Sequence, residues 1–131
     1  EICDLNRRAA MQPVLVEPSL LDLLRRAQTF SESSQGAFDI TVGALIRCWG
    51  FFRGQGRMPE EAAVREALTK VGHSGMLIDP EERTVRFARE GLELHLGAIG
   101  KGFAVDAAVE SLRALGVEAA LVHGGTSTVY G

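Results

Sequence analysis

Residues 95–107, HLGAIGKGFAVDA, place a lysine among glycines where a predicted β-strand runs into a predicted helix. Free backbone N–H groups at a helix start, together with the charge of Lys101, favour an anion. The spacing is not that of a Walker loop, because His95 and Gly102 stand where that motif needs a glycine and a hydroxyl residue. The G-x-G-x-x-G dinucleotide motif does not match either. The alternative is a tight turn with Lys101 in solvent.

Alternating short elements must position this turn. Hydrophobic periodicity predicts helices over 18–30, 59–71 and 101–115, and an apolar run at 40–52 favours a fourth, short helix over a strand. Extended runs predict strands at 76–79, 84–87, 92–96 and 118–122, the first two joined by the turn DPEER as a hairpin. We therefore expect an α+β fold with one largely antiparallel sheet, on which helices 59–71 and 101–115 pack.

Composition sets wider limits. The chain has 131 residues, about the length of one domain. A net charge of −3 gives no basic field for nucleic acid or an anionic membrane. No apolar run approaches the roughly 20 residues that span a bilayer. Two cysteines, Cys3 and Cys48, are too few to suggest a disulfide framework or a zinc knuckle.

Three glycine-containing segments occur in a fixed order: SSQGAFDITVGALIRCWGF, then LGAIGKGFAVD, then ALVHGGTSTVYG. Together with LNRR at residues 5–8, they resemble the ApbE family, the FAD:protein FMN transferases, over nearly the whole chain. The resemblance implies an ApbE-like α+β domain, of which residues 1–131 are the central part. It also implies Mg²⁺-dependent transfer of FMN from FAD to a threonine hydroxyl of an acceptor protein, with release of AMP.

The resemblance also implies roles for individual residues. Ala37, Phe38 and Asp39 would hold part of the FAD, with the Asp39 carboxylate accepting from a ribose hydroxyl or a ring N–H. In the alternative, Phe38 belongs to the core and Asp39 caps the next helix beside Thr41, since aspartate is a favoured N-cap. Both roles stay open.

The lysine turn gains roles in the same way. Ala98 matches a metal-ligand position, which an alanine can fill only through its backbone carbonyl, an acceptable oxygen ligand for Mg²⁺. Lys101 matches a FAD-contacting position and would neutralise the diphosphate. Asp106 matches a family aspartate and would stabilise the start of its helix. No catalytic residue is assigned.

Two positions depart from the family pattern. His95 stands where the family usually has an aspartate that contacts FAD, so this contact would involve a group that titrates near neutral pH. His123 stands in VHGG where the family commonly has N-L-G-G, and a structural role is the simplest interpretation. Neither departure alters the order of the three segments.

The family's H-x-x-x-P-x-T-G and D-x-x-[ST]-T segments, which supply further metal ligands, have no counterpart in these residues. We therefore expect weak or absent Mg²⁺ binding by residues 1–131 alone, and an inactive isolated chain. Two other hypotheses stay open: a non-catalytic flavin- or nucleotide-binding module, and a structural domain whose glycines only make turns. The sequence does not identify the acceptor or the compartment, since family members include periplasmic lipoproteins.

Overall fold

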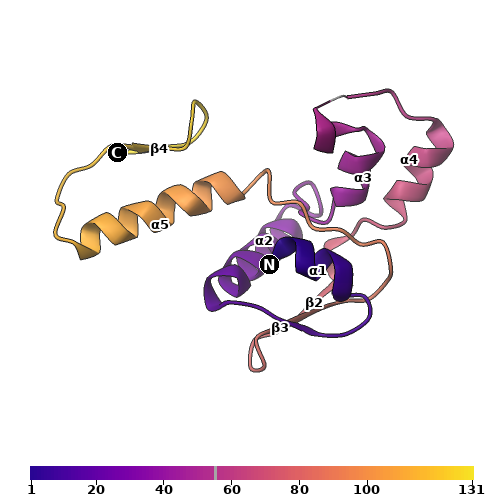
Figure 1. Ribbon diagram of the computed structural model, residues 1–131, viewed down its shortest axis with the longest axis horizontal. Helices are drawn as coiled ribbons and strands as arrows, with labels where there is room; N and C mark the ends of the chain where they lie inside the picture. The colour runs from indigo at the N-terminus through magenta and orange to yellow at the C-terminus, as the bar shows by residue number, and fades with distance from the viewer. Residues whose placement is uncertain (55) are drawn as a thin grey trace. The chain divides into compact units, whose positions relative to one another are not determined.

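The computed structural model describes residues 1–54 and 56–131, and these residues have an α+β fold with two small antiparallel sheets (Figure 1). The chain divides into two units, Glu1–His95 and Leu96–Gly131. The elements of the first unit, in order, are α1 (Ile2–Arg8), β1 (Val14–Leu15), α2 (Pro18–Ser33), α3 (Gly43–Cys48), the 3₁₀ helix η1 (Phe51–Arg53), α4 (Glu61–Leu68), the 3₁₀ helix η2 (His73–Gly75), β2 (Met76–Asp79) and β3 (Thr84–Phe87). Those of the second are α5 (Gly100–Ala114), β4 (Val122–His123) and β5 (Val129–Tyr130).

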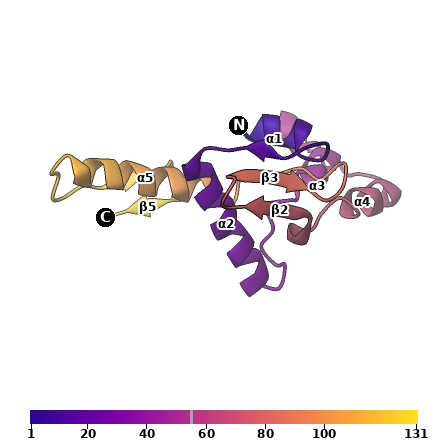
Figure 2. The same cartoon turned by 90° about the horizontal axis from the view of Figure 1, so that it is seen from below.

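The sheet of the first unit has the order β1-β3-β2, and both strand pairs are antiparallel. The predicted hairpin is confirmed: Ile78 faces Val85, and Asp79 faces Thr84. The Asp79 carboxylate stabilises its turn by accepting from the backbone N–H groups of Glu81 and Glu82, both at 3.0 Å. Figure 2 shows β2 and β3 side by side.

The core of the first unit lies between this sheet and α2. Pro18 occupies the first turn of α2, as predicted, where its missing N–H has no cost. The amide of Gln28 donates to the Met76 carbonyl at 3.3 Å, which ties α2 to β2. The buried apolar side chains of α2 and the sheet are Leu20, Leu21, Leu23, Leu24, Ala27, Val14, Met76, Val85 and Phe87.

Two of the predicted helices differ from the observed ones. The apolar run 40–52 is α-helical only over α3 and enters the 3₁₀ helix η1 at Phe51, and helix 59–71 contracts to Glu61–Leu68. After Leu68 the chain is no longer α-helical. The Lys70 amide donates to the carbonyl of the third preceding residue, Ala67, at 3.0 Å, as in a 3₁₀ helix, and the Thr69 hydroxyl donates to the Glu66 carbonyl at 2.7 Å. The prediction that this helix packs on the sheet is wrong: α4 packs on α3 (Figure 1).

The single predicted sheet is also wrong. Residues 92–96 form no named strand within the described part of the chain, where Glu93 makes an isolated parallel bridge with Val42. The predicted strand 118–122 is displaced to Val122–His123, where it pairs with Val129–Tyr130 in a separate sheet. The intervening turn closes through the Gly124 amide and the Thr128 carbonyl at 2.9 Å, and so short a loop costs little entropy to close.

In the second unit the β4-β5 hairpin lies along α5 (Figure 1). Val105 and Val109 are the buried residues of α5, whereas Ala108, which helical spacing places on the same face, is exposed. The helix ends in a Schellman motif: the Val117 amide donates to Leu112 at 3.1 Å, and Gly116 has a φ of +81°. Among the described residues, no helix is long and apolar enough to cross a membrane.

Candidate functional site: the turn after α2 and the lysine turn

The turn 34–38 follows directly from the end of α2. The Gly36 amide donates to the Ser31 carbonyl at 2.8 Å, and the Phe38 amide donates to the Ser34 hydroxyl at 3.0 Å. The ring of Phe38 meets that of Phe30 edge to face, with 6.0 Å between centroids, so Phe38 anchors the turn while remaining half-buried. Ala37 is exposed. The exposed residues of the turn are therefore Gln35, Gly36 and Ala37.

The Asp39 carboxylate points into the protein, where its side chain is 9% exposed. One oxygen accepts from the amide and the hydroxyl of Thr41, both at 2.7 Å. The other accepts from the amide of His73 at 3.0 Å. Asp39 closes an Asx turn and joins it to the start of η2. It is not the N-cap of α3, since that position belongs to Val42.

The extended residues 92–95 lie against this turn. The His95 amide donates to the Ile40 carbonyl at 2.7 Å, and the Gly43 amide donates to the Glu93 carbonyl at 2.9 Å. The structure thus brings the backbone of His95 beside Ile40, the residue that follows the Ala37–Asp39 segment.

A residue outside the predicted site holds the same segment from the other side. The Asn6 amide donates to the Leu94 carbonyl at 3.0 Å, and its oxygen accepts from the Leu94 amide at 2.9 Å. Asn6 belongs to the LNRR stretch, for which the sequence alone predicts no individual role. A side-chain amide that replaces a missing strand partner leaves no periodic signal in the sequence.

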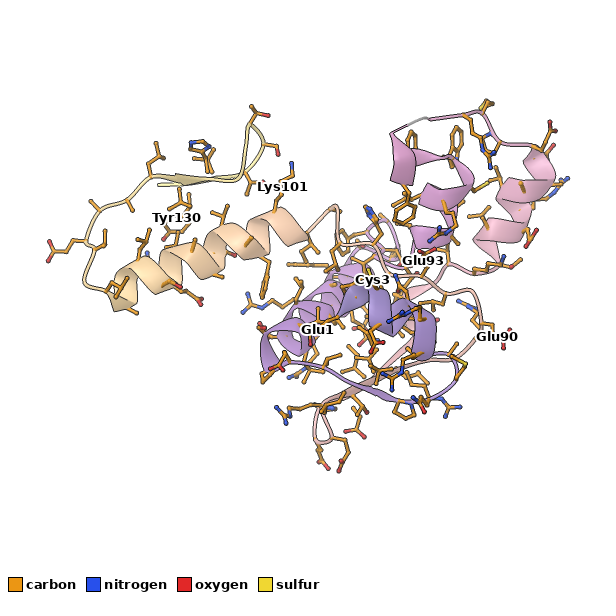
Figure 3. All side chains as sticks on the ribbon, viewed as in Figure 1. Glu1, Cys3, Glu90, Glu93, Lys101 and Tyr130 are labelled. Carbon is orange, nitrogen blue, oxygen red and sulfur yellow. The ribbon has the colours of Figure 1, made fainter. Side chains whose placement is uncertain are left out.

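Aromatic and charged groups surround His95. Its ring lies edge-on to Phe52 with 5.5 Å between centroids, and the Arg47 guanidinium sits 4.8 Å from the centroid of the same Phe52 ring. Arg47 also pairs with Glu93, whose side chain is 17% exposed, and this hydrogen bond, with the attraction between the charges, raises the pKa of Arg47. Glu93 is labelled in Figure 3.

A pocket of about 390 Å³ between α3 and α4 lies among charged groups and contains none of the predicted FAD-binding residues. Its cations are already engaged. Arg47 pairs with Glu93, and Arg57 donates to the Cys48 carbonyl at 3.4 Å. Lys70 pairs with Glu66 at 2.8 Å, and this pair lowers the pKa of Glu66.

The second unit carries the lysine turn. Lys101 lies in the first turn of α5, and its ammonium donates to the Ser127 hydroxyl at 3.0 Å. Ser127 belongs to the glycine turn between β4 and β5, so the second and third of the three glycine-containing segments, LGAIGKGFAVD and ALVHGGTSTVYG, meet here (Figure 3). The His123 ring lies 3.2 Å from the Gly125 carbonyl, which fits a local role in the same turn. Asp106 is the seventh residue of α5, beyond the first turn where the helix dipole acts.

Ala98 is exposed in the turn before α5. A magnesium ion takes about six oxygen ligands. Across residues 1–54 and 56–131, no three His, Cys, Asp or Glu side chains gather as a metal site. The described residues therefore do not fit Mg²⁺ by themselves, and Ala98 could supply one carbonyl at most. Ala37, Phe38, Asp39 and His95 belong to the first unit, and Ala98 and Lys101 to the second.

This chain is similar to known proteins over its whole length. The family model described as the ApbE family matches residues 1–131. The FAD:protein FMN transferase of Treponema pallidum is 38% identical over 124 residues, which cover 90% of this chain and 34% of the relative.

Solved structures agree with this match. The apo flavinyl transferase ApbE of Pseudomonas stutzeri superposes with a TM-score of 0.83 at 30% identity, covering 93% of this chain and 38% of that one. The flavin transferase ApbE of Vibrio cholerae gives a TM-score of 0.87 at 25% identity, covering 95% of this chain and 40% of that one. The chain thus spans between about a third and two fifths of the length of these relatives.

Proposed function

This chain belongs to the ApbE family, and on that premise we propose that the protein is a FAD:protein FMN transferase. It takes FAD as substrate and an acceptor protein with a threonine as partner. The threonine oxygen forms a bond to the phosphorus of the flavin-side phosphate while the bond from that phosphorus to the bridging oxygen breaks. AMP leaves, and the threonine proton passes to a base. The family match over the whole chain carries this proposal.

The residues of the first unit would hold the nucleotide. Ala37 is an exposed residue with a small side chain, which allows close approach, and the half-buried ring of Phe38 provides an apolar surface beside it. The hydrogen bond between the His95 amide and the Ile40 carbonyl keeps His95 next to this turn. His95 would there offer ring nitrogens where the family usually has a carboxylate.

Lys101 would stabilise the charge that develops on the diphosphate oxygens during transfer. A fixed cation contributes most when it is positioned before the reaction. The hydrogen bond from Lys101 to Ser127 supports such positioning, because it restricts a side chain that otherwise has many rotamers. For the metal, we propose only that the Ala98 carbonyl is one ligand among several.

The proposal is tested with the full-length protein, FAD, Mg²⁺ and a threonine-bearing acceptor peptide. We expect the acceptor to gain the mass of FMN and one equivalent of AMP to appear, measured by mass spectrometry and chromatography. An acceptor in which the threonine is replaced by valine is the control, since it lacks the attacking hydroxyl. Tight FAD binding without transfer would instead identify a flavin-binding module. Absence of both FAD binding and FMN transfer would indicate a structural domain.

A further inference from the structure

Thr41 is a buried polar residue with an unusual set of partners. Its side chain and that of Ser31 are the buried polar side chains of the described core, both 0% exposed. The Ser31 hydroxyl donates to the Ala27 carbonyl of its own helix at 3.0 Å, an ordinary arrangement. The Thr41 hydroxyl instead joins two segments that are 31 residues apart in the chain.

The directions of these hydrogen bonds follow from the chemistry of the groups. The Gly72 amide can only donate, so the Thr41 oxygen accepts from it, at 2.8 Å. The Asp39 carboxylate accepts, so the single hydroxyl proton of Thr41 goes to its Oδ1 atom, at 2.7 Å. The His73 amide completes the connection by donating to the other oxygen of Asp39 at 3.0 Å. Thr41 is therefore both acceptor and donor in a continuous bridge from 72–73 to Asp39.

This bridge occupies Asp39. A carboxylate has about four lone-pair positions, and three of them are used, by the amide and hydroxyl of Thr41 and by the amide of His73. With its side chain 9% exposed, Asp39 has little surface left for a nucleotide. Its geometry suits a residue that holds the neighbouring backbone in place.

We infer that Thr41 is a positioning residue of the flavin site. Its hydroxyl, through Asp39, fixes the Ala37–Phe38 backbone against Gly72–His73, and Asp39 acts on FAD through this bridge without touching it. The inference rests on the proposed function, because it takes the 37–38 turn to be the surface that FAD contacts. It changes the role of Asp39 from ligand to support.

The test compares three variants of the full-length protein. Thr41→Val keeps the β-branched shape but removes the hydroxyl, Thr41→Ser keeps the hydroxyl, and Asp39→Asn removes the charge. Ser31→Ala is the matched control, because it also deletes a buried hydroxyl but one that serves only its own helix. The readouts are the FAD dissociation constant, the KM for FAD, kcat, and amide exchange at Gly72 and His73.

We expect Thr41→Val to raise the dissociation constant and KM for FAD by about tenfold, which is the scale of losing one hydrogen bond, with a smaller change in kcat. Thr41→Ser should restore binding to within about twofold of the wild type. The effects of Thr41→Val and Asp39→Asn should be far from additive in the double variant, since both break one bridge. Exchange at Gly72 and His73 should accelerate in Thr41→Val and not in Ser31→Ala.

Two results would overturn the inference. In one, Asp39→Asn weakens FAD binding while Thr41→Val leaves it unchanged, which makes Asp39 a direct ligand. In the other, Thr41→Val and Ser31→Ala lower stability equally and neither alters FAD binding, which makes Thr41 a packing residue. If the wild-type protein binds no FAD, the proposed function fails and the flavin role fails with it. The exchange data then still report separately whether the bridge exists.

Discussion

At the scale of single residues, the two charged side chains of the predicted site have different surroundings. Asp39 is turned inward and held by backbone and hydroxyl donors. Lys101 is exposed and held by one hydroxyl, that of Ser127. An ammonium has three N–H donors, so Lys101 can keep its bond to Ser127 and still donate to a diphosphate oxygen, whereas the Asp39 carboxylate only accepts and already has three donors. Lys101 is therefore the better candidate for a direct contact with the substrate.

The corresponding prediction concerns Lys101→Ala in the full-length protein. We expect kcat for FMN transfer to fall by about 100-fold, the usual scale for losing a donor to a developing oxyanion, with little change in thermal unfolding. Single-turnover transfer to a threonine peptide measures it. Ser127→Ala should be milder, because it loosens the lysine without removing the charge. Arg65→Ala is a control, since Arg65 pairs with Glu61 on the exposed face of α4. A wild-type rate of FMN transfer in Lys101→Ala would show that the lysine turn has no role in catalysis.

At the scale of elements, the close contact between α3 and residues 92–95 positions His95. Gly43 is at the start of α3, and a Cβ atom there would lie 2.6 Å from both the Cγ atom and the carbonyl oxygen of Glu93. No side chain fits without moving the backbone. Position 43 therefore requires glycine, because Glu93 lies too close to leave room for a side chain.

We predict that Gly43→Ala lowers the free energy of unfolding by about 1–3 kcal/mol, the scale of an overpacked site. It should also weaken the contact between His95 and Ile40. Urea denaturation measures the first effect and amide exchange at His95 the second. In contrast, Gly102→Ala within α5 meets no atom within 4 Å and should stabilise the protein by about 0.5–1 kcal/mol. Equal effects at the two glycines would show that the approach of Glu93 is not what constrains Gly43.

At the scale of the whole molecule, the two units differ in how much core each contains. In Glu1–His95 the buried apolar residues include five side chains of α2 and four of the sheet, whereas in Leu96–Gly131 the buried apolar residues are Val105 and Val109. The hydrophobic contribution grows with buried apolar area. The second unit therefore has a smaller hydrophobic contribution to its stability against local unfolding.

We predict that amides of α5 exchange at least about tenfold faster than those of α2 in residues 1–131, because local opening follows buried contacts. Hydrogen-exchange mass spectrometry of the folded chain measures this. The amides of β3, which is paired on both sides, serve as the slow reference. Protection of α5 equal to that of α2 would contradict the prediction and indicate a larger core than two valines provide.

Much of the local structure follows from the sequence because its causes are local. Pro18 marks the start of α2, the run DPEER makes the β2-β3 hairpin, and Gly116 ends α5. Such signals act within a few residues, so they are visible without the fold. The ordered motifs were likewise sufficient to indicate the ApbE family.

Only the tertiary structure decided which segments meet. No periodicity shows that Asn6 pairs with Leu94, that Thr41 bridges Asp39 to Gly72, or that α4 packs on α3 instead of the sheet. These contacts join residues far apart in the chain, and each is made by a single polar group or a close backbone approach. The pattern of apolar residues specifies which faces are buried but not their partners. That choice depends on the three-dimensional packing of the whole unit.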